Sequence, residues 1–237
     1  MFDYILFAII ILISSILQTS TGFGFSIMAT PFLLLLFSPA DAVQINLILS
    51  LFISTALIAK IKKDVDREIL KRFITGSFLG VLIGVWILLT INLSLLKIGV
   101  SLLILLLTVL LILNFRIRQT YKRDLVVGGF SGALTASIGM PGPPLLLYFS
   151  GTEAKKEKLR ATTLAFYLYI YSVSLLLQVI LVGTTTKAWI ASGIGLPLVV
   201  IGLFIGQILF RYINQRTFRI FTYIILIFTG VYLLFGK

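Results

Sequence analysis

Hydroxyl-bearing residues, glycines and prolines gather at two points of an otherwise apolar chain. The first cluster comprises Thr19, Ser20, Thr21, Gly22, Gly24 and Ser26, and the second comprises Ser137, Gly139, Met140, Pro141, Gly142 and Pro143. Glycine and proline are the least favourable residues inside a helix, so each cluster predicts a break in a helix. Glycine also allows a backbone to approach a ligand closely.

The two predicted breaks could bind an anion. A helix that begins at a break exposes amides and the positive end of its dipole, both of which attract anions. Pro143 and Pro144 suit the first turn of such a helix, where an N–H would have no partner. Together with the hydroxyls of both clusters, the amides predict an oxyanion site that needs no buried cation. The alternative is that Gly and Pro only kink membrane helices, with Ser and Thr repairing the kink.

Asn46, Arg160 and Thr162 are further candidates for the site. Asn46 lies near the first cluster and could serve equally as a ligand or as an interhelical hydrogen-bonding group. Arg160 and Thr162 follow the second cluster at the expected edge of the membrane. Arg160 would either attract an anion into the pathway or extend to lipid headgroups.

The apolar segments that must position these residues are long enough to cross a membrane. Of the 237 residues 59% are hydrophobic, which exceeds the share in a soluble domain. The mean hydropathy is +1.12, and the apolar runs are continuous rather than alternating. We therefore predict an all-α polytopic membrane protein of about 8–10 segments. The expected segments are 2–19, 23–37, 42–59, 73–91, 95–114, 125–138, 143–150, 161–182, 188–210 and 217–235.

The residue types that are missing narrow the chemistry. The sequence contains no Cys and no His, and no Asp or Glu falls in the middle of a predicted span. Thiolate chemistry, imidazole proton relays and the usual zinc and haem sites are therefore excluded, and we expect neither cofactor nor metal. An enzyme is not expected, because no acid–base pair or activated nucleophile can be assembled.

The basic residues predict how the chain lies in the membrane. Lys and Arg number 20 against 8 Asp and Glu, and 17 of the 20 fall in the loops 60–72, 115–124, 150–160 and 210–219. Basic loops mark the cytoplasmic side and contact lipid headgroups, so we expect membrane lipids rather than nucleic acid as partners. The alternation of segments then predicts a plasma-membrane protein with both termini outside.

The two halves of the chain resemble one another. GVWILLTINLSLLKI (84–98) matches GQILFRYINQRTFRI (206–220) at an offset of 122, which also aligns Gly80 with Gly202. We therefore predict a first repeat at 1–115, a basic cytoplasmic linker at 116–124 and a second repeat at 125–237. Each repeat holds five segments, so the second enters the membrane inverted, with broken or re-entrant helices in matching positions. Secondary transporters are often built in this way.

Small residues predict close helix packing. Gly76, Gly80 and Gly84 are spaced by four residues, as are the pairs Gly128/Gly132 and Gly202/Gly206. Such spacing is typical of helix-packing faces in membranes. These faces could serve within one chain or between chains, so a homo-oligomer stays open.

Two stretches carry a resemblance to a known family. GMPGPPLLLYFSG (139–151), followed by KLRATTLAFYL (158–168), resembles the second-half signature of the sulfite exporter TauE/SafE family of permeases. TGFGFSIMATPFLLLLFSPADAVQINLILSL (21–51) resembles the first-half signature. The resemblance covers nearly the whole chain. Its signature positions are Gly22, Gly24, Pro31, Gly139, Gly142, Pro143, Pro144, Arg160, Ala161 and Thr162.

The resemblance implies transport of a small anionic substrate that contains sulfur or a carboxylate, often outward. Phe25, Ser26, Met140 and Pro141 stand where the family commonly has Gly or Ser, which leaves the substrate open. We therefore predict a permease that binds sulfite, an organosulfonate or a related anion at the paired breaks near the membrane midplane. The alternative is a membrane scaffold or assembly partner that transports nothing.

Overall fold

The computed structural model shows a helical protein. It describes residues 2–90, 92–113, 119–150, 155–212, 220, 223–224, 227–228, 230–232 and 234. These residues contain nine α-helices and no strand, which confirms the all-α prediction. Five of the helices, α1, α3, α4, α8 and α9, are long and apolar enough to cross a membrane. The tenth expected segment, 217–235, lies in part outside the described residues.

The helices follow the predicted order. They are α1 (Phe2–Thr21), α2 (Phe25–Leu36), α3 (Pro39–Ile61), α4 (Arg67–Thr90), α5 (Leu93–Ile112), α6 (Tyr121–Ile138), α7 (Gly142–Ser150), α8 (Lys156–Leu181) and α9 (Thr186–Tyr212), with a 3-10 turn η1 (Lys62–Asp64) after α3. Helix α1 ends and α2 begins at the first cluster, and α6 ends and α7 begins at the second. Both clusters therefore interrupt helices.

Several helices begin earlier than predicted. Helix α4 begins at Arg67 instead of 73, and α8 begins at Lys156 instead of 161. Hydropathy marks only the lipid-facing part of a helix, whereas Lys, Arg and Glu are themselves good helix formers and extend the helices beyond it. For the same reason Tyr121–Asp124, expected in the linker, forms the first turn of α6, which is capped by the Thr120 hydroxyl accepting from the Arg123 amide.

Glycine faces bring two pairs of helices into backbone contact. Helix α4 packs along α6, and a β-carbon at Gly80 would lie 2.0 Å from the carbonyl oxygen of Gly129. Helix α9 packs along α1, and a β-carbon at Gly202 would lie 2.4 Å from the Ser15 β-carbon. The prediction that these glycines form helix-packing faces is confirmed, and the faces act within the chain.

We expect Gly80→Ala to destabilise the protein, because its methyl group would push two backbones apart. Overpacking a tight site costs about 1–3 kcal/mol. A matched control is Gly193→Ala in α9, where an added β-carbon meets nothing within 4 Å. Alanine there should stabilise the helix by up to about 1 kcal/mol. Thermal unfolding in detergent measures both, and a Gly80→Ala protein as stable as Gly193→Ala would contradict the close contact.

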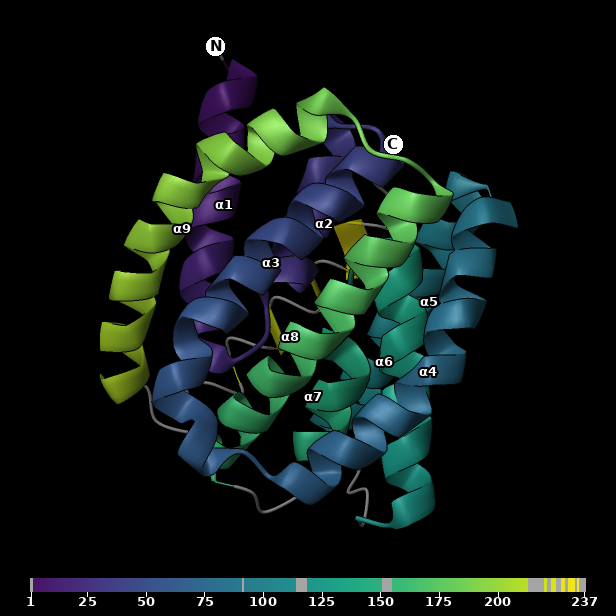
Figure 1. Cartoon of the computed structure of the whole chain (residues 1–237), viewed down its shortest axis with the longest axis vertical. Helices are drawn as coiled ribbons and strands as arrows, with labels where there is room; N and C mark the ends of the chain where they lie inside the picture. The colour runs from purple at the N-terminus through teal and green to yellow at the C-terminus, as the bar shows by residue number, and fades with distance from the viewer. Residues whose placement is uncertain are drawn as a thin grey trace.

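Helices α3 and α8 form the centre of the molecule. In Figure 1, α1 and α9 lie on one side, α4, α5 and α6 lie on the other, and α3 and α8 lie between them. Near the start of α3, Asp41 accepts a hydrogen bond of 2.6 Å from Thr185, which follows the end of α8. Near the start of α8, Lys158 pairs with Asp66, which follows the end of α3, at 2.7 Å. The two central helices therefore run antiparallel.

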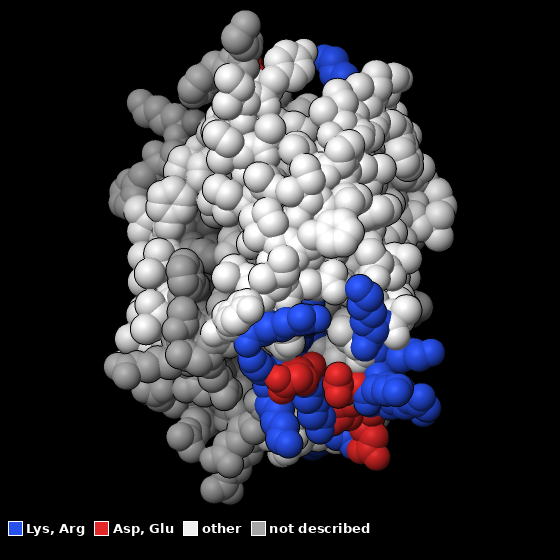
Figure 2. All heavy atoms as spheres, turned by 90° about the vertical axis from the view of Figure 1, so that its left-hand side faces the viewer, with Lys and Arg blue, Asp and Glu red and all other residues white. Residues whose placement is uncertain are grey.

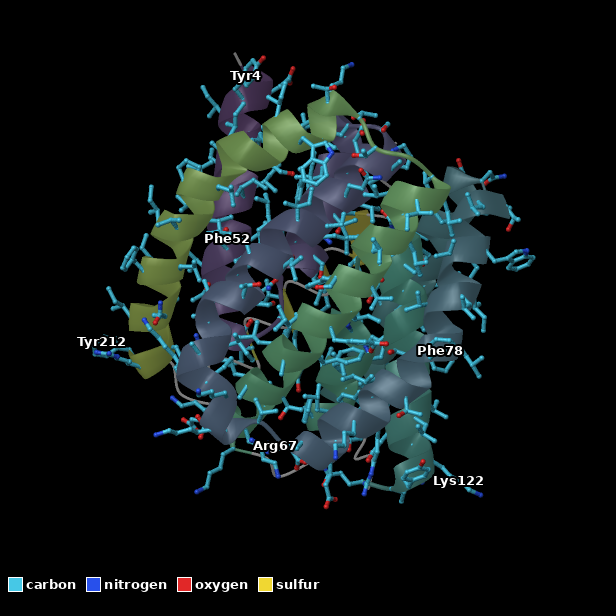
Figure 3. All side chains as sticks on the ribbon, viewed as in Figure 1. Tyr4, Phe52, Arg67, Phe78, Lys122 and Tyr212 are labelled. Atoms are coloured by element: carbon cyan, nitrogen blue, oxygen red, sulfur yellow. The ribbon has the colours of Figure 1, made fainter. Side chains whose placement is uncertain are left out.

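Charged side chains gather at one end of the molecule. Figure 2 shows most of the visible Lys and Arg side chains at that end, with Asp and Glu among them. Arg67 and Lys122 lie at this end, opposite Tyr4 (Figure 3). We call it the basic end; it contains the start of α4, of α6 and of α8.

Candidate functional site

The first break turns at two glycines in the left-handed region. Gly22 has a φ of 85° and Gly24 a φ of 124°. The Gly22 amide still donates to the Gln18 carbonyl at 2.8 Å, so α1 closes fully before the chain turns. The Thr21 hydroxyl donates to the Leu17 carbonyl at 2.6 Å and accepts from the Phe23 amide at 3.2 Å. This hydroxyl shapes the turn between α1 and α2.

The second break is a glycine C-cap. Gly139 has a φ of 73°, its amide donates to the Thr135 carbonyl at 2.8 Å, and the Met140 amide donates to the Leu134 carbonyl at 3.1 Å. The bond from the Gly139 amide to the Thr135 carbonyl is the 5→1 bond of an αL helix end. The Asn46 side-chain amide donates from Nδ2 to the Gly139 carbonyl at 2.7 Å. This amide therefore satisfies a backbone acceptor at the end of α6.

Prolines reduce what the second break can offer an anion. Pro143 and Pro144 lie in the first turn of α7, as predicted. Neither they nor Pro141 has an N–H, so Gly142 supplies the one backbone donor between residues 141 and 144. The first break has more free backbone donors. The first hydrogen bond of α2 runs from the Met28 amide to the Gly24 carbonyl at 3.0 Å, so the amides of Phe25 and Ser26 make no hydrogen bond within the helix.

The structure brings the helices that follow the breaks together, but not the breaks themselves. Gly22 lies against Arg160, in the second turn of α8, and Gly139 lies against Asn46, in the second turn of α3. Because α3 and α8 run antiparallel, the two breaks lie toward opposite ends of this pair. Helices α2 and α7 meet between them, where a β-carbon at Gly142 would lie 3.0 Å from the Ile27 side chain.

Three of the six predicted hydroxyl ligands, Ser20, Thr21 and Ser137, donate to carbonyls of their own helices. Ser20 donates to the Ile16 carbonyl at 2.7 Å, and Ser137 donates to the Ala133 carbonyl at 2.7 Å. Such back-bonding is common for Ser and Thr inside helices and occupies their only donor. Thr162 instead accepts a 3.0 Å hydrogen bond from the Asp66 amide, which ties α8 to the loop after α3. Thr19 packs against Gly206 of α9, with its hydroxyl buried and without a partner.

Arg160 is a buried cation beside the first break. Only 7% of its surface is exposed, and its guanidinium carbon lies 4.2 Å from the centre of the Phe210 ring. Its Nε and one Nη have no hydrogen-bond partner, and among the described residues no carboxylate pairs with it. The expectation of a site that needs no buried cation stays a prediction, although the structure places a buried cation beside the first break. A charge in this position is costly unless an anion compensates it.

Acidic residues near the basic end are engaged elsewhere. Asp66 pairs with Lys158; burial raises the pKa of Asp66, but hydrogen bonds from Lys158 and the Ile69 amide outweigh burial and leave it below its usual value. Asp124 is fully buried, and it accepts from Arg72 at 3.0 Å and from the Tyr148 hydroxyl at 2.7 Å. Arg160 therefore does not share these carboxylates.

Two tyrosines of α8 join the region between α2 and α7, and the sequence interpretation missed them. The Tyr171 hydroxyl lies 3.4 Å from Ser26 Oγ, and the Tyr167 and Tyr171 ring centres are 4.9 Å apart. Both side chains are fully buried. The available signal was their four-residue spacing after Thr163, which places all three on one helix face.

The sequence model of one protein family, described as sulfite exporter TauE/SafE, matches residues 6–233. The chain belongs to the TauE/SafE family. No curated protein and no solved structure matches the chain. TauE/SafE proteins are membrane transporters of sulfite and related sulfur anions and are not enzymes. The family and the apolar helices together make the chain a multi-pass membrane protein with a small anionic substrate.

Proposed function

We propose that this TauE/SafE chain is a secondary transporter of sulfite, an organosulfonate or a related small anion, and that Arg160 binds the anion beside the first break. The observation that carries the proposal is the buried Arg160 guanidinium with two unpartnered nitrogens. An oxyanion would supply both the charge and the acceptors that this group lacks. Guanidinium groups bind planar or pyramidal oxyanions through two parallel hydrogen bonds.

The start of α2 adds to this site. The amides of Phe25 and Ser26 lie at the positive end of the α2 dipole. Gly22 lets the turn approach Arg160, since a β-carbon there would lie 2.9 Å from the Arg160 Cα atom. The site thus combines one fixed charge with nearby helix-terminal donors, a mixture suited to an anion with several oxygens.

The packing supports an inverted repeat. Helix α1 packs on α9 and α4 on α6, so exchanging the first half of the chain for the second converts one pair into the other. The aligned residues Gly80 and Gly202 both lie in these contacts. Likewise, Gly22 contacts the second turn of α8 while Gly139 contacts the second turn of α3. Transport would then proceed by rocking of packed helices about the central site, with the basic end in the cytoplasm and both termini outside the plasma membrane.

Ligand-dependent stabilisation of the purified chain tests the proposal. The panel is sulfite, sulfate, thiosulfate, sulfoacetate, taurine, acetate and chloride. A ligand that binds only the folded state at a hundred times its Kd stabilises that state by about 2.7 kcal/mol. We expect a sulfur oxyanion to raise the melting temperature and to be carried into proteoliposomes. Neither stabilisation nor flux with any anion would favour the scaffold.

A further inference from the structure

Helix α8 carries a continuous polar face through the centre of the molecule. Residues three and four apart share one side of a helix, and the members of this face follow that spacing. They are Arg160, Thr163, Tyr167, Tyr171, Ser174 and Gln178. All are buried, and the face extends from the second turn of α8 almost to its end.

Polar atoms on this face lack partners. Thr163 Oγ1, the Tyr167 hydroxyl, Ser174 Oγ and Gln178 Oε1 are buried and make no hydrogen bond. Most buried polar groups in native proteins are hydrogen-bonded, so a series of unpartnered groups along one face indicates that something else occupies it. The hydroxyls that make up most of this face suit a hydrated or oxygen-rich ligand better than an apolar one.

Tyr167 stands at the start of α7. A β-carbon at Gly142, the first residue of the nine-residue α7, would lie 3.1 Å from the Tyr167 hydroxyl. The Tyr167 side chain is fully buried, and its hydroxyl has no partner. The positive end of the α7 dipole and an unpartnered O–H donor thus lie against each other at Gly142, which has no side chain to separate them.

This point is distinct from the Arg160 site. Tyr167 follows Arg160 by seven residues, which is about 10 Å along a helix axis. The Arg160 guanidinium packs on Phe210, whereas the Tyr167 hydroxyl packs on Gly142, so the two side chains end beside different elements. We infer that Tyr167 and the start of α7 form a second, uncharged binding position for the transported oxyanion, reached from Arg160 along α8. This inference rests on the proposed function.

The second position would help the ion to leave Arg160. An ion bound to a buried charge dissociates slowly unless a second binding position lies nearby. Hydroxyls and a helix terminus offer hydrogen bonds without a full charge, so they hold an oxyanion weakly. They also discriminate by the number of acceptor atoms, which favours sulfite over chloride.

Flux and binding separate the two positions. The variant is Tyr167→Phe, which removes one oxygen, and the matched control is Tyr169→Phe, which removes the same atom two residues along on another face of α8. The probe is radiolabelled sulfite, kept anaerobic, with the full chain in proteoliposomes. We expect Tyr167→Phe to lower maximal flux at least tenfold while the sulfite Kd in detergent changes less than twofold. Tyr169→Phe should alter neither.

A second variant and a crystallographic measurement test the inference in case Tyr167→Phe does not fold. Gly142→Ala places a methyl group beside the Tyr167 hydroxyl, and it should reproduce the loss of flux with little change in Kd if Tyr167→Phe proves unstable. Selenite, a pyramidal analogue of sulfite, should give two anomalous peaks in crystals of the wild-type chain, one at Arg160 and one at Tyr167.

The outcomes are distinguishable. Equal flux in Tyr167→Phe and Tyr169→Phe, or a single selenite peak at Arg160, would overturn the second position and leave the proposed function standing. Water alone would then fill the polar face. Wild-type chain that neither binds nor carries sulfite would overturn the proposed function, and this inference with it.

Discussion

Arg160→Met is expected to abolish anion-dependent stabilisation and to reduce sulfite transport at least a hundredfold. Hydrogen bonds to a charged group contribute about 1.5–3 kcal/mol each, and a hundredfold loss corresponds to about 2.7 kcal/mol. The same change should raise the melting temperature of the anion-free protein, because an unpaired buried charge is removed. Methionine keeps an apolar stem against Phe210, where its sulfur contacts the ring favourably. Melting temperatures with and without sulfite, together with proteoliposome flux, measure both effects.

Two further variants make the Arg160 result specific. Lys122→Gln removes a charge from the exposed basic end and should leave the sulfite Kd within twofold. Arg160→Lys keeps the charge but loses the planar pair of donors, so we expect intermediate binding. An unchanged sulfite Kd in Arg160→Met would show that the guanidinium only packs against Phe210.

Gly22→Ala should impair transport strongly and destabilise the protein by about 2 kcal/mol or more. A left-handed backbone costs a residue other than glycine about 1–2 kcal/mol. At Gly22, where φ is 85°, the methyl group would also lie 2.9 Å from the Arg160 Cα atom. Backbone cannot move aside as a side chain can, so α8 and Arg160 must shift. We expect at least a tenfold loss of sulfite flux.

Gly183→Ala is a control that has the cost of a left-handed backbone without the steric contact to another helix. Gly183 has a φ of 86°, almost the same as Gly22, but an added β-carbon meets nothing within 4 Å. Gly183→Ala should therefore lose only about 1 kcal/mol of stability and retain transport. Thermal unfolding and flux of the two variants compare them directly. If Gly22→Ala and Gly183→Ala lose the same stability and keep the same flux, the close contact between Gly22 and Arg160 is not needed for transport.

The breaks could be predicted from the sequence because their causes are local. Gly22, Gly24 and Gly139 adopt positive φ angles, and Pro143 lies in the first turn of α7 as expected. The glycine faces were predictable too, since spacing alone puts small residues on one side of a helix. The helix starts at Arg67 and Lys156 were missed, because hydropathy follows lipid contact and says little about charged turns beyond it.

The candidate site was less predictable, because it depends on where each polar group makes its hydrogen bonds. Ser20 and Ser137 lie at the breaks but donate to their own helices, which residue type alone does not reveal. The burial of Arg160 arises from contact with Gly22 and Phe210, which are distant in sequence. The place of Tyr167 beside the start of α7 likewise depends on a contact between residues distant in sequence.

The glycine contacts also determine which helices can behave as rigid units. Helices α4 and α6 touch through backbone atoms, as do α1 and α9, so neither pair can slide without separating. Each pair takes one helix from each half of the chain. The order of the polypeptide and the arrangement of its packed helix pairs therefore differ. A chain cut between α5 and α6 would yield two fragments, each holding one helix of both pairs. Such fragments would need one another to fold. A functional protein could form from them only if α1 paired with α9 and α4 with α6 across the two fragments.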